Sequence, residues 1–307
     1  MLAYFLRRLG GAIPTLFVVM TVTFFMMRLA PGGPFDRERM LAPAVEANIK
    51  KAYNLDQPLV VQYGLYLSKA LRGDLGPSFK YQDYTVVELI SSGFPVSFEI
   101  GITAILLALL VGGGLGIFAA LRQNSGIDHA VMATAMIGIT VPNFVMAPLM
   151  TLVLGVYLRL LPVGGYSGGS LRNLILPTVA LALPPVAYIA RLTRASMIEV
   201  LRSNYIRTAR AKGLPGRLVV GRHALRAALL PVVSYLGPTI AGIITGSVVI
   251  ETIFGIPGIG RYFVQGALNR DYTLVMGVVI FYGALIILLN LLVDLIYAVL
   301  DPKIRYD

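Results

Sequence analysis

Cysteine and tryptophan are absent from this 307-residue sequence, histidine occurs only twice, and charged residues make up just 13% of the chain. A chain without cysteine forms neither disulfides nor thiolate metal sites. His129 and His223 are distant in the sequence, and neither has another histidine or a carboxylate cluster at ligand spacing. We therefore expect this chain to hold no metal ion and no cofactor.

Two common enzyme motifs are missing or out of context. The phosphate-binding pattern G-x-x-x-x-G-K-[ST] does not occur, so any dependence on ATP and Mg²⁺ must come from a partner. Residues 165–169 match G-x-S-x-G, but a nucleophile elbow needs a strand before it, a helix after it and a histidine within reach. We expect a glycine turn around Ser167, not a hydrolase, and no enzymatic activity in this chain.

Hydrophobic residues make up 57% of the sequence, and soluble domains carry about 25% charged residues, roughly twice the share found here. This composition indicates a membrane protein. The net charge of +11 is also typical of nucleic-acid binding, but a polytopic membrane protein carries basic residues in its cytoplasmic loops. We expect no nucleic-acid partner.

Long apolar stretches predict an all-α, polytopic membrane protein with a six-helix bundle. Crossing a hydrocarbon core of about 30 Å takes roughly 20 helical residues. Six stretches meet this length: 9–29, 96–121, 130–158, 174–190, 229–250 and 274–300. G-x-x-x-G spacings at Gly112/Gly116 and Gly242/Gly246 favour close helix packing within the bundle, with a gating or dimer contact as the alternative.

The first span follows Arg7 and Arg8 and is too long for a cleaved signal peptide, so it is predicted to be a signal anchor. With these arginines in the cytoplasm, an even number of spans places both termini there. The long outside segment, residues 31–95, has apolar residues at helical spacing between Leu59 and Leu71. We expect a helix there, lying on the membrane or against the bundle.

Polar residues within the spans give a candidate path for a hydrophilic solute. Asn290 and Asp294 are four positions apart and share one face of the last span. Glu99 and Glu251 are further candidates, because ionisable groups in spans usually face the bundle interior or water, although a carboxylate near a span end reaches water without a functional role. The predicted path comprises Thr140, Asn143, Thr245, Ser247, Asn290 and Asp294.

The stretch IFGIPGIGRYFVQGALNRDY, which begins at Ile253, is a candidate outer gate. Its glycines and proline interrupt a helix, while its isoleucines and phenylalanine are apolar enough to close a mouth. An ordinary amphipathic connector is the alternative. The candidate gate residues are Ile253, Phe254, Gly255, Ile256, Pro257 and Gly258.

Positive charge is concentrated between Arg191 and Arg226, where nine Lys/Arg accompany a single acid, Glu199. The apolar residues among them predict two short amphipathic helices separated at Gly213-Leu214-Pro215. Such a basic knob on the inner face suits anionic lipid, a ribosome or a cleft on a cytoplasmic protein.

At these residues the sequence resembles the membrane subunits of ABC importers, whose cytoplasmic loop carries an E-A-A-x-x-x-G motif that couples to the ATPase. Gly213 aligns with the motif glycine and Ala209 with its second alanine, while Arg207 and Thr208 replace the first two residues. RTARAKGL and RHALRAALLP resemble the dipeptide/oligopeptide branch. So do FLRRLGGAIPTLFVV, RLAPGGPF, LRGDLGPSFKYQDYTV, IETIFGIPGIGRYFVQGALNRDY and LLVDLIYAVLDPKIRY.

This resemblance covers nearly the whole chain and is greatest for the first, B-type, membrane subunit of a bacterial oligopeptide importer. It implies the type I ABC importer permease fold, with a first helix and periplasmic segment over residues 1–94 and a five-helix core over 95–307. A coupling loop is implied at about 195–228. The ATPase-coupling residues would then be Arg207, Thr208, Ala209, Arg210, Gly213 and Leu214.

The implied assembly lies in the bacterial inner membrane, where membrane lipid is one of its partners. It contains a homologous second permease subunit, two cytoplasmic ABC ATPases that bind ATP and Mg²⁺, and a periplasmic peptide-binding protein. Peptides are the expected substrate. The alternatives are a related permease for nickel chelates or another small solute, and an ATPase-independent channel or insertase.

Overall fold

In the computed structural model, residues 2–29, 51, 54–81 and 83–300 are described, and for 2–9, 246 and 294–300 the description covers the backbone alone. Within this part of the chain the secondary structure is helical, and the only extended pairing is a single bridge between Pro77 and Thr85. The chain forms two compact units. Unit one contains Ser97–Ile256 and Ile286–Asp307, and unit two contains Leu2–Val96 and Pro257–Leu285.

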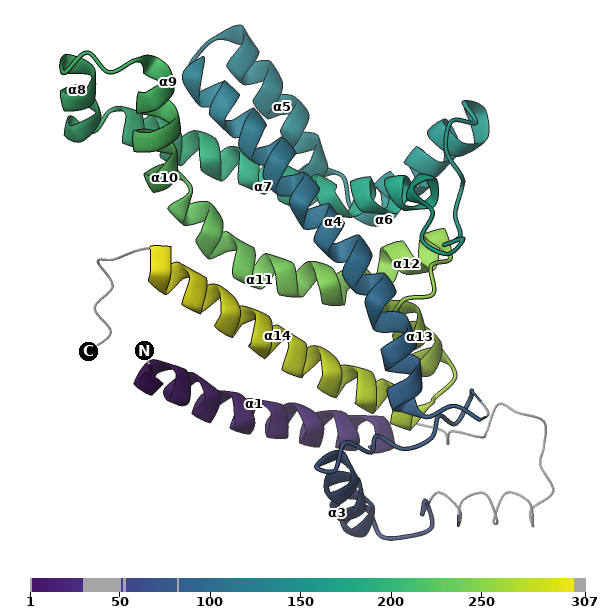
Figure 1. The fold of residues 1–307 in the computed structure, drawn as a ribbon. Coiled ribbons are helices and arrows are strands. Elements are labelled where there is room, and N and C mark those ends of the chain that lie inside the picture. Colours follow the sequence, from purple (N-terminus) through teal and green to yellow (C-terminus); the bar gives the residue numbers. More distant parts are fainter. Residues whose placement is uncertain (1, 30–50, 52–53, 82, 301–307) are drawn as a thin grey trace. The chain divides into compact units, whose positions relative to one another are not determined.

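Unit one holds most of the helices shown in Figure 1. The later part of α4 (Val86–Leu121) is followed by α5 (Gly126–Thr140), α6 (Asn143–Met150) and a wider helical turn, η1 (Thr151–Tyr157). Next come the long α7 (Leu171–Leu201), then α8 (Asn204–Ala211), α9 (Gly216–Leu218), η2 (Val219–Ala224) and α10 (Leu225–Ala228). The unit is completed by α11 (Leu230–Gly246), α12 (Val248–Phe254) and the second half of α14 (Tyr272–Leu300).

Close packing of α4 against α7 depends on the first predicted glycine pair. A Cβ atom at Gly112 would lie 2.6 Å from the Val186 carbonyl oxygen, and one at Gly116 would lie 2.5 Å from that of Ala190. Any side chain would therefore push the two backbones apart, so the packing interpretation of this pair is confirmed. The second pair differs, because a Cβ atom at Gly242 would meet nothing within 4 Å.

The described residues contain five helices long and apolar enough to cross a membrane, and a sixth span if one bent pair counts as one. The prediction of a continuous span over 130–158 is corrected here. The helical segments Gly126–Thr140 and Asn143–Tyr157 are separated by a break at which the chain bends by 105°. The cause is local. Pro142 disfavours helical geometry at Val141, which is extended with φ −93° and ψ 118°.

Unit two consists of α1 (Leu2–Leu29), α3 (Leu59–Ala70), the start of α4, α13 (Ile259–Leu268) and the first half of α14. The helix predicted between Leu59 and Leu71 is confirmed as α3. It packs on the end of α1 through an aromatic cluster in which the buried Phe24 ring lies 5.2 Å from Tyr63 and 5.7 Å from Tyr66.

A buried carboxylate fixes the start of α14 in this unit. Asp271 is fully buried, and its Oδ1 accepts a hydrogen bond from the Leu274 N–H, which caps the helix. Its Oδ2 accepts from the Ser78 hydroxyl and from the backbone N–H groups of Phe79 and Lys80. The turn at 78–80 is thereby held on the end of α14.

Candidate coupling loop, path and gate

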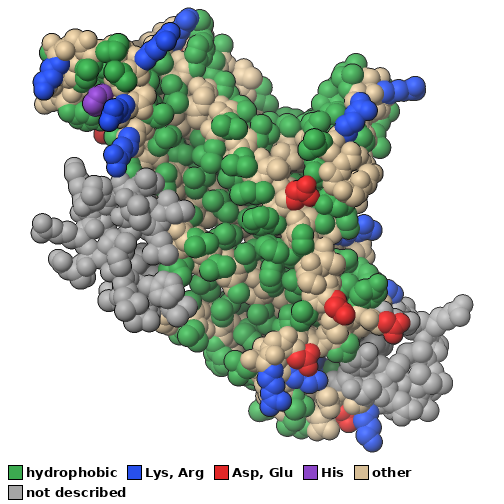
Figure 2. Space-filling view, viewed as in Figure 1, with side chains coloured by type: hydrophobic (Ala, Val, Ile, Leu, Met, Phe, Trp, Pro, Cys, Tyr) green, Lys and Arg blue, Asp and Glu red, His purple; other side chains and the backbone are tan. Residues whose placement is uncertain are grey.

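The basic loop folds as two helical segments in unit one. The first residues of the loop, up to Leu201, extend α7, and the two predicted short helices are α8 and the continuous run of α9, η2 and α10. Figure 2 shows Lys and Arg side chains gathered where Figure 1 places α8 and α9. No carboxylate of the described residues forms an ion pair with Arg207 or Arg210. These cations are therefore available for a partner.

Gly213 ends α8 in a left-handed conformation, with φ +78°. The Leu214 N–H donates to the Ala209 carbonyl at 3.3 Å, and the Gly213 N–H donates to that of Arg210 at 3.0 Å. This pattern is typical of a glycine-terminated helix. A Cβ atom at Gly213 would meet nothing within 4 Å inside the chain. What requires glycine within this chain is therefore the backbone conformation and not a lack of space.

Several apolar residues of the loop pack against the bundle. Ile206, Ala209 and Val219 are buried together with Met197 of α7 and Ala120 of α4. The apolar periodicity of α8 therefore serves to attach the loop to the bundle, and Ala209 lies in that attachment. Leu214 is half-buried against the same cluster.

The outer face of the loop carries different residues. Arg207, Thr208, Arg210 and Gly213 are exposed, and their role in docking stays a prediction. Two large side chains that we did not predict, Tyr205 and Leu218, are also exposed there, at 49% and 46%. An exposed surface that mixes cations with aromatic and aliphatic side chains suits a protein partner.

An ion pair ties the C-terminal part of α7 to the start of α5. Arg194 donates from Nε to Asp128 Oδ1 and from Nη2 to Oδ2, both at 2.6 Å, and Asp128 is fully buried. The Asn124 N–H also donates to Oδ2, and the Ser125 hydroxyl accepts from the Asp128 N–H. We did not predict this pair, although Ser125-x-x-Asp128 has the spacing of a helix-capping motif.

The six predicted path residues do not join in one hydrogen-bonded cluster within the described side chains. Thr140 and Thr245 donate their hydroxyls to carbonyls of their own helices, those of Met136 and Ala241. Asn143 is half-buried, and its Oδ1 has no partner among the described residues. Asn290 is half-buried with its Oδ1 near Gly237 of α11, and the side chain of Asp294 lies outside the described part of the chain.

Ser247 and Glu251 form a separate buried pair. Glu251 Oε1 accepts a hydrogen bond from the Ser247 hydroxyl and a second, at 2.7 Å, from the Ser97 hydroxyl of α4. Both Ser247 and Glu251 have no exposed surface. Glu251 therefore does not reach water at a span end, and it connects α12 to α4.

Glu99 has a more accessible position in the same unit. It is half-exposed, and its Oε2 accepts a hydrogen bond of 2.8 Å from the Tyr166 hydroxyl. This bond raises the pKa of Tyr166. One turn along α4, the hydroxyls of Thr103 and Thr178 lie 3.3 Å apart. These four side chains form a polar line between α4 and α7 that the sequence did not reveal as a group.

The predicted gate begins where α12 ends. Gly255 is left-handed, with φ +65°, and the Ile256 N–H donates to the Glu251 carbonyl. Phe254 and Ile256 are buried, and Ile253 and Pro257 are half-buried. The loop before α7 contacts this end directly, because the Gly165 N–H donates to the Phe254 carbonyl at 2.7 Å. The chain passes from unit one to unit two between Ile256 and Pro257.

The loop containing Ser167 shows no catalytic arrangement. Ser167 is exposed with φ +43°, and Gly165, Gly168 and Gly169 also have positive φ, as expected for a glycine turn. Among the described residues no His, Cys, Asp and Glu side chains group in a way that could hold a metal ion.

Family models match both parts of the sequence. Residues 112–306 match the binding-protein-dependent transport system inner membrane component, and residues 1–100 match the N-terminal component of the same systems. The chain belongs to this family. The permease is 58% identical over 306 residues to the oligopeptide transport system permease protein OppB of Salmonella typhimurium, with both chains fully covered.

Other relatives agree. The permease is 53% identical to OppB of Haemophilus influenzae, with both chains fully covered. It is 46% identical over 305 residues to the dipeptide transport system permease protein DppB of Bacillus subtilis, covering 99% of this chain and 98% of that one.

The inward-facing MetNI methionine ABC transporter shares the fold, with a TM-score of 0.57 over 70% of this chain and 97% of that chain at 18% identity. The predicted all-α permease fold of an ABC importer is thereby confirmed.

Proposed function

We propose that this permease is one membrane-spanning subunit of an ATP-driven importer that moves oligopeptides from the periplasm to the cytoplasm. The observation that carries this proposal is the 58% identity to oligopeptide permeases over the full length of both chains. Peptides vary in their side chains but share a polar backbone and charged termini. A mildly polar path suits them better than a tight pocket.

The same similarity to oligopeptide permeases supports the proposed partners. A homologous second permease subunit would complete the pore, two cytoplasmic ABC ATPases would bind ATP and Mg²⁺, and a periplasmic peptide-binding protein would deliver the substrate. The subunit would lie in the inner membrane, with both termini in the cytoplasm. We assign no ATP hydrolysis to this chain. The division at residue 94 into an N-terminal part and a permease core stays a prediction.

Coupling to the ATPases is assigned to the exposed face of α8 and the turn that follows it. This face includes Arg207, Thr208, Arg210 and Gly213, which we predicted, and Tyr205, which the fold adds. Ala209 and Leu214 would act indirectly, since both pack toward the bundle. A rigid attachment is what a coupling element needs, because movement of a bound ATPase must be transmitted to α7 and α4.

The candidate path is assigned to unit one. The candidate gate is assigned to the segment where the chain leaves unit one. Glu99, Tyr166, Thr103 and Thr178 add a polar line to the six predicted path residues. The gate would comprise residues 253–258, together with the Gly164–Gly165 backbone that contacts Phe254.

An uptake experiment tests the function. Cells that lack their own peptide permeases would be given this chain with its partner subunits and supplied with labelled peptides of two to five residues. Uptake that needs ATP and the binding protein supports the proposal. Uptake of a nickel chelate in place of peptides would assign a different solute. Peptide flux without any ATPase, or co-purification with ribosomes, would favour the channel or insertase.

A further inference from the structure

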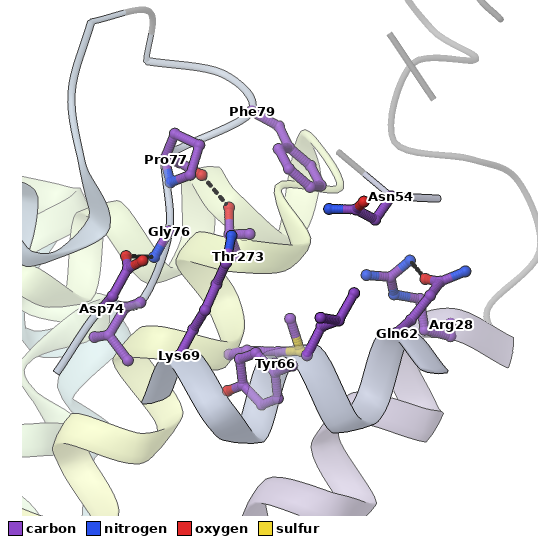
Figure 3. Close-up of a pocket in the computed structure, with 13 residues that line it drawn as sticks. Arg28, Asn54, Gln62, Tyr66, Lys69, Asp74, Gly76, Pro77, Phe79 and Thr273 are labelled. Carbon is purple, nitrogen blue, oxygen red and sulfur yellow. Dashed lines mark hydrogen bonds between the residues drawn. The ribbon is translucent and has the colours of Figure 1, made fainter. Parts of the chain in front are cut away.

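A pocket of about 190 Å³ lies in unit two. Figure 3 shows it between the end of α1, the face of α3, the turn after α3 and the start of α14. Its polar lining residues are Arg28, Asn54, Gln62, Tyr66, Lys69, Asp74 and Thr273.

Arg28 is fixed in this pocket by its neighbours. Its guanidinium carbon lies 5.2 Å from the centre of the Phe24 ring and 5.3 Å from that of Tyr272. Its Nη1 donates to Gln62 Oε1, and Gln62 is itself held, because its Nε2 donates to the backbone carbonyl of Gln57. The buried Nε has no acceptor among the described residues. A cation is therefore preorganised with unused donor capacity.

Tyr66 and Lys69 also line the pocket. The Tyr66 hydroxyl is buried and has no partner among the described residues, and burial raises the pKa of this group, so it stays a donor at neutral pH. Lys69 is exposed and forms no ion pair within the described chain. Asp74, the only carboxylate among the described lining residues, accepts from the Gly76 N–H at 2.8 Å. Among the described lining residues, donors and positive charge are thus in excess, and an anion matches them.

The pocket lies at the level where two spans begin or end. Arg28 is the last residue but one of the candidate span Gly10–Leu29, and Tyr272 and Thr273 are the first residues of Tyr272–Val293. The surrounding Phe24, Tyr63 and Tyr66 form the kind of aromatic cluster that is enriched at membrane interfaces. This is the depth of lipid phosphates.

The outer surface of α3 supports the same depth. Val60, Leu65 and Leu71 are exposed at 76%, 42% and 87%, and Leu65 also lines the pocket. One cation, Lys69, and two tyrosines accompany these aliphatic side chains on α3, a composition that suits a helix at the membrane interface. Acyl chains would cover these aliphatic side chains while the headgroup enters the pocket.

We propose that this pocket binds the phosphate of an anionic phospholipid, held by Arg28 and Lys69. The lipid would bridge α1 and α3 and so fasten the outside segment to the first span. A soluble phosphate shares the chemistry of the headgroup, but the depth of the pocket and the exposed aliphatic face of α3 favour the lipid.

The absence of tryptophan allows a direct test. Leu65→Trp places one fluorophore at the pocket of the full-length chain in nanodiscs. Quenching by phosphatidylglycerol brominated on its acyl chains is compared with quenching by brominated phosphatidylcholine. One surface cation contributes about a fivefold preference for an anionic lipid, so two predict at least a tenfold preference. Lys69→Gln should lower this preference about fivefold, and Arg28→Gln combined with Lys69→Gln should abolish it.

The matched control is Arg72→Gln, which removes an exposed charge beside the same end of α3 but does not line the pocket. It should lower the preference less than Lys69→Gln does, because Arg72 does not line the pocket, and equal losses in the two variants would overturn the proposal. Lys69 is exposed, so Lys69→Gln tests the proposal even if Arg28 variants fail to fold. Equal quenching by the two lipids would overturn the proposal, as would an unchanged preference in Lys69→Gln. Loss of the preference when millimolar inorganic phosphate is added would assign the pocket to a soluble anion instead.

Discussion

Arg194 holds the buried carboxylate of Asp128 through two parallel hydrogen bonds of 2.6 Å, joining α7 to the start of α5. The two residues are 66 positions apart in the sequence. A bidentate pair of this kind fixes both the distance and the relative orientation of the two helices that it joins. Because α8 follows α7 in the chain, the ion pair also contributes to the position of α8.

Arg194→Gln is expected to destabilise the permease by about 3 kcal/mol, because it leaves a buried carboxylate without its cation. Replacing both Arg194 and Asp128 by alanine should cost less than the Gln substitution alone. The measurement is thermal unfolding of the purified chain in detergent. Arg191→Gln is the control, since Arg191 is exposed and only lies over the Tyr188 ring. Equal losses in Arg191→Gln and Arg194→Gln would contradict the assignment.

Gly213→Val should leave insertion and abundance normal but abolish substrate-stimulated ATP hydrolysis in the assembled complex. A β-branched residue resists the observed φ of +78°, at a cost of about 1–3 kcal/mol. Gly213→Asn should retain most activity, because asparagine tolerates the left-handed region. The measurement pairs membrane abundance with ATPase rate.

Gly216→Val is the control for this series. Gly216 is exposed, has no positive φ, and a Cβ atom there would meet nothing within 4 Å. It should behave as the unmodified chain does. If Gly213→Val couples normally while a change in an outside loop does not, the ATPase contact lies elsewhere.

Neutralising Arg207 or Arg210 is expected to weaken ATPase binding by no more than about 1 kcal/mol each, because both are exposed and a rim charge pair contributes little. The affinity of the permease for the isolated ATPase, measured at two salt concentrations, checks this. A loss of more than tenfold for either single variant would mean that the arginine is buried on docking.

Single cysteines at Glu99 and Asn290 should react with a water-soluble thiol reagent, and the rate should change with nucleotide. The natural absence of cysteine makes the background clean. A cysteine at Ala187 is the control and should stay protected, since Ala187 of α7 has no exposed surface and is not a candidate path residue. Protection of position 290 in every nucleotide state would assign Asn290 to packing against α11, and the same result at 99 would remove Glu99 from the path.

Gly164→Val should slow transport without lowering abundance. A Cβ atom at Gly164 would lie 2.8 Å from the Phe254 carbonyl oxygen, so a side chain would force the loop away from the end of α12. Labelled-peptide uptake is the measurement. Leu160→Ala is the control in the same loop, because Leu160 is 57% exposed. Undiminished uptake in Gly164→Val would remove this contact from the gate.

Local chemistry alone determined several features of this protein. Apolar length identified the spans, periodicity identified α3, and Gly213 identified the end of α8. These features depend on residues within one or two helical turns, so the sequence contains the necessary information. The bend at Pro142 is equally local, and the long apolar run around it concealed the signal.

The tertiary structure decided which side chains meet across helices. Glu251 binds Ser97 from 154 positions away, and Asp128 binds Arg194, although each residue by itself is an ordinary polar side chain in an apolar segment. The sequence also showed that α8 has an apolar face but not that Met197 and Ala120 would cover it. Such pairings depend on the rotation and crossing point of packed helices, which are set by the summed contacts of many residues and not by any local pattern.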